Sequence, residues 1–244
     1  MSEWFKDWFN TKEYQEVYQH RNDADARELY SLIMDHIEIP EEGKVLDLAC
    51  GSGRHSVLFA KKGFDVTAMD LSENLLKVAK NNAWKEAVKV KFIEADIRHF
   101  WLNEKFDLVV NLFTSFGYFE KDEENFSIFA TASGMLKPGG YFVFDFMNRG
   151  YVENNLVKES KGQVAGEVII QKRRIEGDRV IKDIIICNNG ITKTFYESVK
   201  MYRLDELVKA VSEKGLAIKQ TFGDFKGNKY IEESSPRIII VAQK

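Results

Sequence analysis

A turn rich in glycine, placed between an apolar stretch and an expected helix, is the first feature of this sequence that can bind a ligand. Residues 45–49 are apolar except for Asp47, and Gly51 and Gly53 follow before a helix begins. Glycine lacks a Cβ atom, so backbone at these positions can approach a ligand closely. In an open parallel sheet, ligands bind just outside the carboxyl ends of the strands. The turn is therefore a candidate binding loop.

Two further acids stand where the next two expected strands end. Asp70 follows a strand expected at 64–69, and Asp96 follows one expected at 88–95. A carboxylate at Asp70 can accept both hydroxyls of a ribose, and one at Asp96 can accept from an adenine amino group. Each acid alone could cap a helix or lie in solvent. Three acids at successive strand ends, beside a glycine turn, indicate a site for an adenosine.

Two adenosine cofactors suit this arrangement, and the residues favour one of them. NAD uses Gly-x-Gly-x-x-Gly, with its pyrophosphate at the helix N-terminus. Here the third glycine position is Ser56, and Asp47 would repel a pyrophosphate. The same carboxylate suits the ammonium group of a methionine moiety, directly or through water. The loop therefore favours S-adenosylmethionine (SAM), which carries no phosphate.

The elements that must position these residues alternate between strands and helices. A helical pattern over 11–38 ends at Pro40 and Gly43. Residues 164–202 predict an antiparallel meander of three strands, with turns at 176–178 and 188–190. The remaining expected strands are 45–49, 64–69, 88–95, 106–112, 141–147, 216–222 and 237–242, and the remaining helices are 54–62, 72–84, 122–136 and 204–214. Strands alternating with helices predict a mostly parallel sheet.

The sequence resembles the class I SAM-dependent methyltransferase family. The family's acid-x-Gly-x-Gly-x-Gly motif is matched by residues 47–53, with Ala49 in place of the first glycine. The turn at 136–140 also matches, and the motifs together span 44–148. The resemblance implies SAM as the cofactor. It implies cofactor contacts by Tyr14, Tyr18, Arg21, Asp47, Ala49, Gly51, Gly53, Asp70, Leu71, Asp96, Ile97, Asn111 and Leu112.

The fold that this resemblance implies is an α/β, Rossmann-like class I methyltransferase fold. It has a mostly parallel seven-stranded sheet flanked by helices, with an antiparallel β insert after strand five. The expected parts are an N-terminal helical lid (1–43), a SAM-binding core (44–150), the insert (151–202) and a C-terminal helix with two core strands (203–244). The insert is expected to cover the substrate or to form a dimer contact.

Residues 111–119 further resemble a bacterial subgroup of small-molecule N-methyltransferases, which includes enzymes acting on amino sugars. The Asn/Asp-Pro-Pro-Tyr motif of adenine and glutamine-amide methyltransferases is missing, since Asn111 is followed by Leu-Phe-Thr. Methyl transfer by in-line displacement needs no metal, and no residue stands out as a catalytic base. The substrate candidates are Phe116, Tyr118, Phe119, Asn148, Tyr196, Tyr202 and Arg237.

The expected function is methyl transfer from SAM to a nitrogen or oxygen of a small molecule. Two alternatives remain open: an NAD-dependent oxidoreductase, and a SAM-binding protein acting on a macromolecule such as RNA. The formal net charge of −3 does not indicate a nucleic-acid partner. No apolar run reaches the ~18 residues of a membrane span, and two cysteines make no disulfide framework. We therefore expect a cytoplasmic protein, and a homodimer contact is one of the two roles that the insert leaves open.

Overall fold

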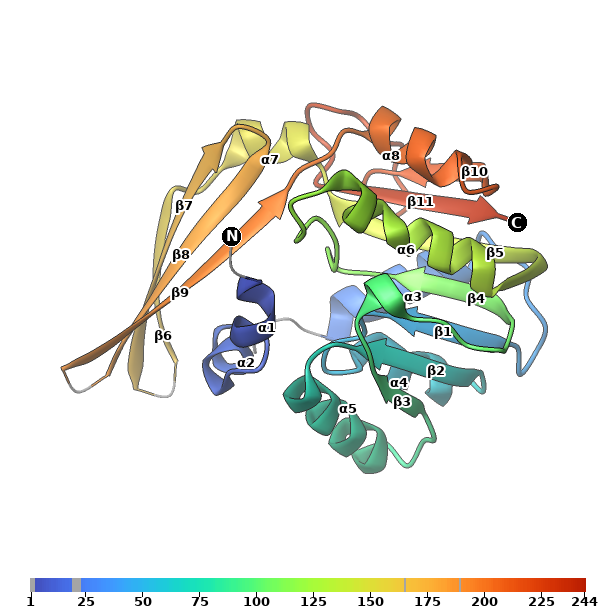
Figure 1. Cartoon of the computed structure of the whole chain (residues 1–244), viewed down its shortest axis with the longest axis horizontal. Coiled ribbons are helices and arrows are strands. Elements are labelled where there is room, and N and C mark those ends of the chain that lie inside the picture. Colours follow the sequence, from blue (N-terminus) through green and yellow to red (C-terminus); the bar gives the residue numbers. More distant parts are fainter. Residues whose placement is uncertain (1–2, 19–22, 165, 189) are drawn as a thin grey trace.

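The core of the protein is a seven-stranded sheet with helices on both faces (Figure 1). The computed structural model describes residues 3–18, 23–164, 166–188 and 190–244. The strand order is β10-β11-β5-β4-β1-β2-β3. All neighbours pair in parallel except β11, which runs antiparallel to both β5 and β10. This confirms the expected mostly parallel sheet.

The central strands of this sheet are apolar, as burial on both faces requires. Val45, Leu46 and Leu48 of β1 are fully buried, and β4 is buried along its whole length. The bounds are β1 Lys44–Leu48, β2 Asp65–Asp70, β3 Lys91–Glu94, β4 Phe106–Asn111, β5 Leu136–Met147, β10 Ala217–Phe222 and β11 Arg237–Gln243. The carboxyl ends of β1, β2 and β3 therefore lie side by side at one edge.

Helices cover the two faces of this sheet with separate apolar clusters. Helices α6 and α8 pack on one face, and α3 and α4 pack on the other. Ser72 caps α5 as expected, because its Oγ accepts from the amide of Leu75. The bounds are α3 Asp23–Met34, α4 Arg54–Lys61, α5 Glu73–Lys85, η1 Ile97–His99, α6 Asp122–Met135, α7 Arg149–Asn155 and α8 Leu204–Ser212.

The insert after β5 forms a second, antiparallel sheet in the order β6-β7-β8-β9. Its strands are β6 Glu159–Val164, β7 Glu167–Glu176, β8 Arg179–Asn188 and β9 Ile191–Lys200. The expected meander had three strands. The structure adds β6, whose sequence is polar, and the short helix α7 before it.

Two short N-terminal helices, α1 Trp4–Trp8 and α2 Lys12–Tyr18, lie between the second sheet and the core (Figure 1). Trp8 and Val17 pack on Ile169, Ile184 and Ile186 of the second sheet. Of the helix expected over 11–38, the structure describes α2 up to Tyr18 and α3 from Asp23 to Met34, and residues 35–38 are not helical. The segment 1–43 contacts both sheets, since α3 packs on the core.

A smaller difference concerns strand five. The turn expected at 137–140 is an irregular stretch inside β5, where Gly139 has a φ of 79° and the pairing with β4 shifts register. Among the helices of the described residues, none is both long and apolar enough to cross a bilayer.

Candidate active site

The glycine turn after β1 has the left-handed backbone that its sequence predicts. Residues Ala49, Gly51 and Gly53 have φ values of 58°, 55° and 74°. Nothing lies within 4 Å of the point where a Cβ on Gly51 would be, so this residue faces open space. A Cβ on Gly53 would lie 2.8 Å from the Cβ of Ala79 on α5. The missing side chain of Gly53 therefore lets α5 pack closely, and a backbone contact of Gly53 with the cofactor remains a prediction.

Asp70, at the end of β2, is tied to the turn by backbone hydrogen bonds. Its Oδ2 accepts from the amide of Gly51 at 2.7 Å, and its Oδ1 accepts from the amide of Ser72 at 2.8 Å. The side chain is buried, and burial raises its pKa above the ordinary value despite these bonds. Each carboxylate oxygen has two lone pairs, so capacity remains for two ligand hydroxyls.

Asp47 lies inside the same site without a cationic partner among the described residues. Its Oδ2 accepts a 2.5 Å hydrogen bond from Ser56 Oγ on α4. The carboxyl is almost fully buried, and burial, assisted by the nearby charge of Asp70, raises its pKa to about 7. A ligand that brings a positive charge here would favour the ionised form.

Asp96 follows β3 and is held by its own neighbour. Both of its carboxylate oxygens accept from the Arg98 guanidinium, which also reaches Glu3 of the N-terminal segment. Burial raises the pKa of Asp96, but the hydrogen bonds from Arg98 outweigh it, so the pKa lies below its ordinary value. Asp96 thus stays ionised, and its contact with an adenine remains a prediction.

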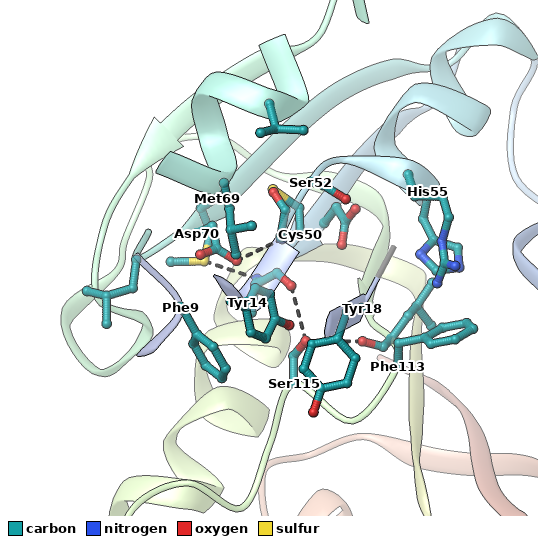
Figure 2. Close-up of a pocket in the computed structure, with 18 of the residues that line it drawn as sticks. Phe9, Tyr14, Tyr18, Cys50, Ser52, His55, Met69, Asp70, Phe113 and Ser115 are labelled. Carbon is teal, nitrogen blue, oxygen red and sulfur yellow. Dashed lines mark hydrogen bonds between the residues drawn. The ribbon is translucent and has the colours of Figure 1, made fainter. Parts of the chain in front are cut away.

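Asp47, Asp70 and Asp96 line one cavity of about 760 Å³. Figure 2 shows Asp70 and Cys50 along one side of it, with Phe9, Tyr14 and Tyr18 along the other. Its volume lies within the range of ordinary small-molecule sites. The predicted cofactor contacts that it brings together are Tyr14, Tyr18, Asp47, Ala49, Gly51, Asp70, Leu71, Asp96, Ile97 and Leu112.

Asn111, another predicted cofactor residue, does not line this cavity. Asn111 is fully buried, and its Nδ2 donates to the carbonyl of Leu48 at 2.8 Å, so it ties β4 to the end of β1 behind the cavity wall. Its Oδ1 has no hydrogen-bond partner in the part of the chain that the structure describes. Arg21 lies outside the described residues.

His55, which follows the glycine turn, also lines this cavity near Phe113 (Figure 2). It is buried, and no described residue hydrogen-bonds its Nε2. Burial, with a smaller contribution from the charge of Arg54, lowers its pKa to about 3. The imidazole is therefore neutral near neutral pH.

A second cavity of about 320 Å³ lies between the N-terminal helices, the insert and the core. Aromatic side chains form a wall common to both cavities: Phe9, Tyr14, Tyr18, Phe113 and Tyr118 line each of them. Phe9 contacts both Tyr14 and Tyr118 edge to face, with ring centroids 4.9 and 5.3 Å apart. The two cavities therefore adjoin along these aromatic rings.

The backbone beside this aromatic wall is strained. Phe113 and Thr114 are consecutive residues with φ values of 59° and 64°, a region that side chains other than glycine rarely adopt. Asp145 at the end of β5 accepts from the Phe113 amide at 2.9 Å, and Arg237 bonds both Asp145 Oδ1 and Thr114 Oγ1. Such strain often concentrates at ligand sites, where surrounding bonds hold it.

Glu197 is one of the charged residues of the second cavity that were not predicted from the sequence. It accepts from Trp8 Nε1 and the Tyr18 hydroxyl, each at 2.6 Å, and lies 2.7 Å from Lys182 Nζ. Burial raises its pKa, but the charge of Lys182 outweighs this and holds the pKa below the ordinary value. One signal was available: residue 197 alternates in phase with the apolar Phe195 and Val199.

The predicted substrate residues divide between the cavities and the protein interior. Phe116, Tyr118 and Phe119 line the first cavity, and Tyr118 and Arg237 line the second. Asn148 instead caps α7 and bonds the carbonyls of Glu232 and Ser235. The hydroxyl of Tyr202 bonds Asp122 and Asn125 in the core. Tyr196 alternates with Glu197, so it lies on the face of the second sheet away from the cavity.

Comparisons with known proteins agree with this architecture. Residues 45–140 match the sequence model of the family described as "Methyltransferase domain". The structure of the CcbJ methyltransferase from Streptomyces caelestis superimposes with a TM-score of 0.81, at 19% identity, over 99% of this chain and 98% of the other. Residues 45–140 thus match a methyltransferase domain, and the chain as a whole shares the fold of that solved methyltransferase.

Two curated relatives show how far the similarity extends. A dTDP-3-amino-3,4,6-trideoxy-alpha-D-glucopyranose N,N-dimethyltransferase from Streptomyces venezuelae is 34% identical over 50% of this chain and 49% of its own length. A glycine/sarcosine N-methyltransferase from Halorhodospira halochloris is 26% identical over 82% of this chain and 75% of its own. The chain spans about half the length of the first of these relatives.

Proposed function

We propose that this chain transfers a methyl group from SAM to a nitrogen of a small molecule. The observation that carries the proposal is the pair of adjoining cavities: one gathers the acids and the glycine turn, and the other meets it across the aromatic wall. The two curated relatives described above are both named as N-methyltransferases, which supports nitrogen over oxygen as the acceptor atom.

The residues of the first cavity fit SAM in their chemistry. Asp70 offers carboxylate lone pairs for the two ribose hydroxyls, and Gly51 leaves its side open. Asp47 is a buried acid for which the described residues supply no cation, and the cofactor's ammonium group would supply one. A dinucleotide would instead place a diphosphate beside this acid. The cavity therefore favours SAM over NAD.

The protein's part in the reaction is to align the reactants and exclude water. Bound SAM would supply a methyl group on a sulfonium: the nucleophile would bond to the methyl carbon in line as the carbon–sulfur bond breaks and the sulfur leaves as a neutral thioether. The aromatic wall of Phe9, Tyr14, Tyr18, Phe113 and Tyr118 surrounds the region where the two cavities meet, and ring faces stabilise nearby cations. Holding reactants in such an arrangement accounts for much of the rate in transfers of this kind.

Tyr18 is positioned for this alignment by groups on the second sheet. Its hydroxyl donates to Glu197 and accepts from Lys182, while its ring lines both cavities. The insert therefore fixes one member of the aromatic wall, which supports its role as a cover over the substrate. We further propose that the chain works in the cytoplasm. A homodimer through the insert stays a prediction.

Cofactor binding is tested by calorimetry with SAM and with its demethylated product S-adenosylhomocysteine (SAH). Asp70→Asn should lose at least tenfold in SAH affinity, because the amide cannot accept both ribose hydroxyls through charged oxygens. Asp65→Asn is the matched control. It lies at the opposite end of the same strand, exposed, and should leave the affinity unchanged. No heat with either nucleoside would refute the proposal.

The acceptor class is tested with SAM that carries a labelled methyl group. The label should appear on amines when the protein is incubated with a pool of small metabolites and the products are separated by mass. Label found only on hydroxyl groups would correct the acceptor atom to oxygen. Label found only on added RNA would favour the macromolecular alternative.

A further inference from the structure

The second cavity is lined by a cationic side chain that no acid among residues 3–18, 23–164, 166–188 and 190–244 neutralises through an ion pair. Three cationic side chains line it: Arg173, Lys182 and Arg237. Lys182 forms an ion pair with Glu197 at 2.7 Å, and Arg237 forms one with Asp145 at 2.8 Å. No acid among the described residues forms an ion pair with Arg173. The cavity thus has one guanidinium without a carboxylate.

Neutral oxygens hold that guanidinium in place. Arg173 donates to Gln171 Oε1 at 2.7 Å, to Ser160 Oγ at 3.0 Å and to the carbonyl of Val157 at 3.4 Å. A guanidinium has five N–H donors, so these three contacts leave donors for a further group. The contacts also restrain the side chain, so less conformational entropy is lost when a ligand binds.

The register of the second sheet places this charge at a defined distance from the aromatic wall. Arg173 pairs with Lys182 across β7 and β8, and Lys182 pairs with Glu197 across β8 and β9. Directly opposed residues share a face of the sheet. The three side chains therefore form a row. The Cα atoms of Arg173 and Glu197 are two strand spacings apart, which is about 10 Å. Glu197 in turn bonds Tyr18 of the wall.

We propose that Arg173 binds an anionic group, a carboxylate or a phosphate, on the methyl acceptor. This inference rests on the proposed function and narrows the acceptor to small molecules that carry a negative charge at a distance from the nucleophilic atom. A guanidinium matches both anions with two parallel hydrogen bonds, which makes it selective for them over neutral groups. The acceptor's anion lies at the insert, and its nucleophile lies at the aromatic wall.

The test uses the full chain saturated with SAH and titrated with sodium phosphate or sodium acetate at constant ionic strength. Trp4 lines the second cavity, so tryptophan fluorescence reports binding there. Arg173→Gln should weaken binding of the preferred anion at least tenfold, and Arg173→Lys should retain part of it. Arg174→Gln is the matched control. Arg174 lies on the other face of β7 and is paired with Glu176 and Asp183.

Each result decides the inference. Phosphate binding that depends on Arg173 supports a phosphorylated acceptor, and acetate binding that depends on it supports a carboxylic acid. Binding of neither anion, or equal loss in Arg173→Gln and Arg174→Gln, overturns the inference even if SAH binds. Absence of SAH binding with Arg173-dependent anion binding intact would instead refute the proposed function alone. Thermal melting of each variant confirms that it is folded.

Discussion

Ser56 Oγ donates a 2.5 Å hydrogen bond to Asp47 Oδ2, and both side chains are buried at the end of β1. This bond stabilises the carboxylate, but burial outweighs it, and the pKa of Asp47 is raised to about 7. The protein without cofactor thus holds a proton on Asp47 under mildly acidic conditions. A cofactor ammonium must displace that proton, which links binding to pH.

SAH affinity should therefore increase as the pH rises through 7. With a pKa of about 7, Asp47 is ionised in about a tenth of molecules at pH 6 and in about nine-tenths at pH 8. The affinity should rise about tenfold over this interval in calorimetric titrations. Asp47→Asn should bind SAH weakly with a much flatter pH profile. An equally steep profile in that variant would show that another group is responsible.

Burial raises the pKa of Asp47 but lowers that of His55, so the two groups change the stability of the folded protein with pH in opposite directions. The folded pKa of His55, about 3, lies below the unfolded value, so the unfolded chain binds more protons between these values. The stabilisation is complete above about pH 6.5 and is lost as the pH falls toward 3. His55→Gln should remove this loss. Denaturant unfolding of both proteins at pH 7 and pH 4.5 measures it, and parallel losses in the two proteins would contradict the assignment.

Ala49→Gly should stabilise the protein. Ala49 has a φ of 58°, where a side chain is strained and glycine is not. We expect a gain of ~1 kcal/mol, which raises the melting temperature by about 2–4 °C in a chain of this size. Ala60→Gly, inside helix α4, is the matched control and should lose ~1 kcal/mol instead. A loss in both variants would show that relief of strain at Ala49 is not the dominant effect.

The two glycines of the turn should respond differently to alanine. Gly53→Ala places a Cβ 2.8 Å from Ala79, so it should cost on the order of 2 kcal/mol or more in unfolding free energy. Gly51→Ala meets no atom within 4 Å, so its cost is limited to backbone strain. It should mainly weaken SAH binding, because the methyl group enters the cavity. Calorimetry and thermal unfolding of both variants separate the effects, and identical behaviour would be inconsistent with this geometry.

Glu197→Gln should destabilise the protein and slow methyl transfer while SAH binding is largely kept. The change leaves Lys182 without its buried partner, at a cost on the order of 3 kcal/mol. The double variant Glu197→Gln with Lys182→Met removes both charges and should recover much of that stability. Transfer should remain slow in the double variant, because the Tyr18 hydroxyl has lost Lys182 as a donor and the carboxylate of Glu197 as its charged acceptor. Full recovery of transfer would show that Glu197 has no role in positioning Tyr18.

The core of the fold was predictable because its signals are local. Apolar runs such as 45–49 and 106–112 identify buried strands, and Ser72 and Gly63 mark helix ends that the structure confirms. Strand β6 was missed because its sequence, Glu-Ser-Lys-Gly-Gln-Val, carries no apolar alternation. Its structure depends on pairing with β7, and the residues of one segment alone do not predict which strand it pairs with.

In the candidate site, too, some residues were predictable from local sequence and others were not. Asp47, Asp70 and Asp96 are found from strand ends alone, and the structure brings them to one cavity. The row of Arg173, Lys182 and Glu197 depends on the register of two hairpins, which single-strand patterns do not fix. The left-handed backbone at Phe113 is held by Asp145, a distant residue in the sequence. Such contacts appear only when the chain is folded.

Parallel calorimetric titrations of the intact protein with SAH and with NAD test the central claim most directly. The claim is that the ends of β1, β2 and β3 hold an aminoacyl nucleoside without a diphosphate. The account predicts saturable heat with SAH, lost in Asp70→Asn and kept in Asp65→Asn, and no heat with NAD. Saturable binding of NAD together with no binding of SAH would contradict it.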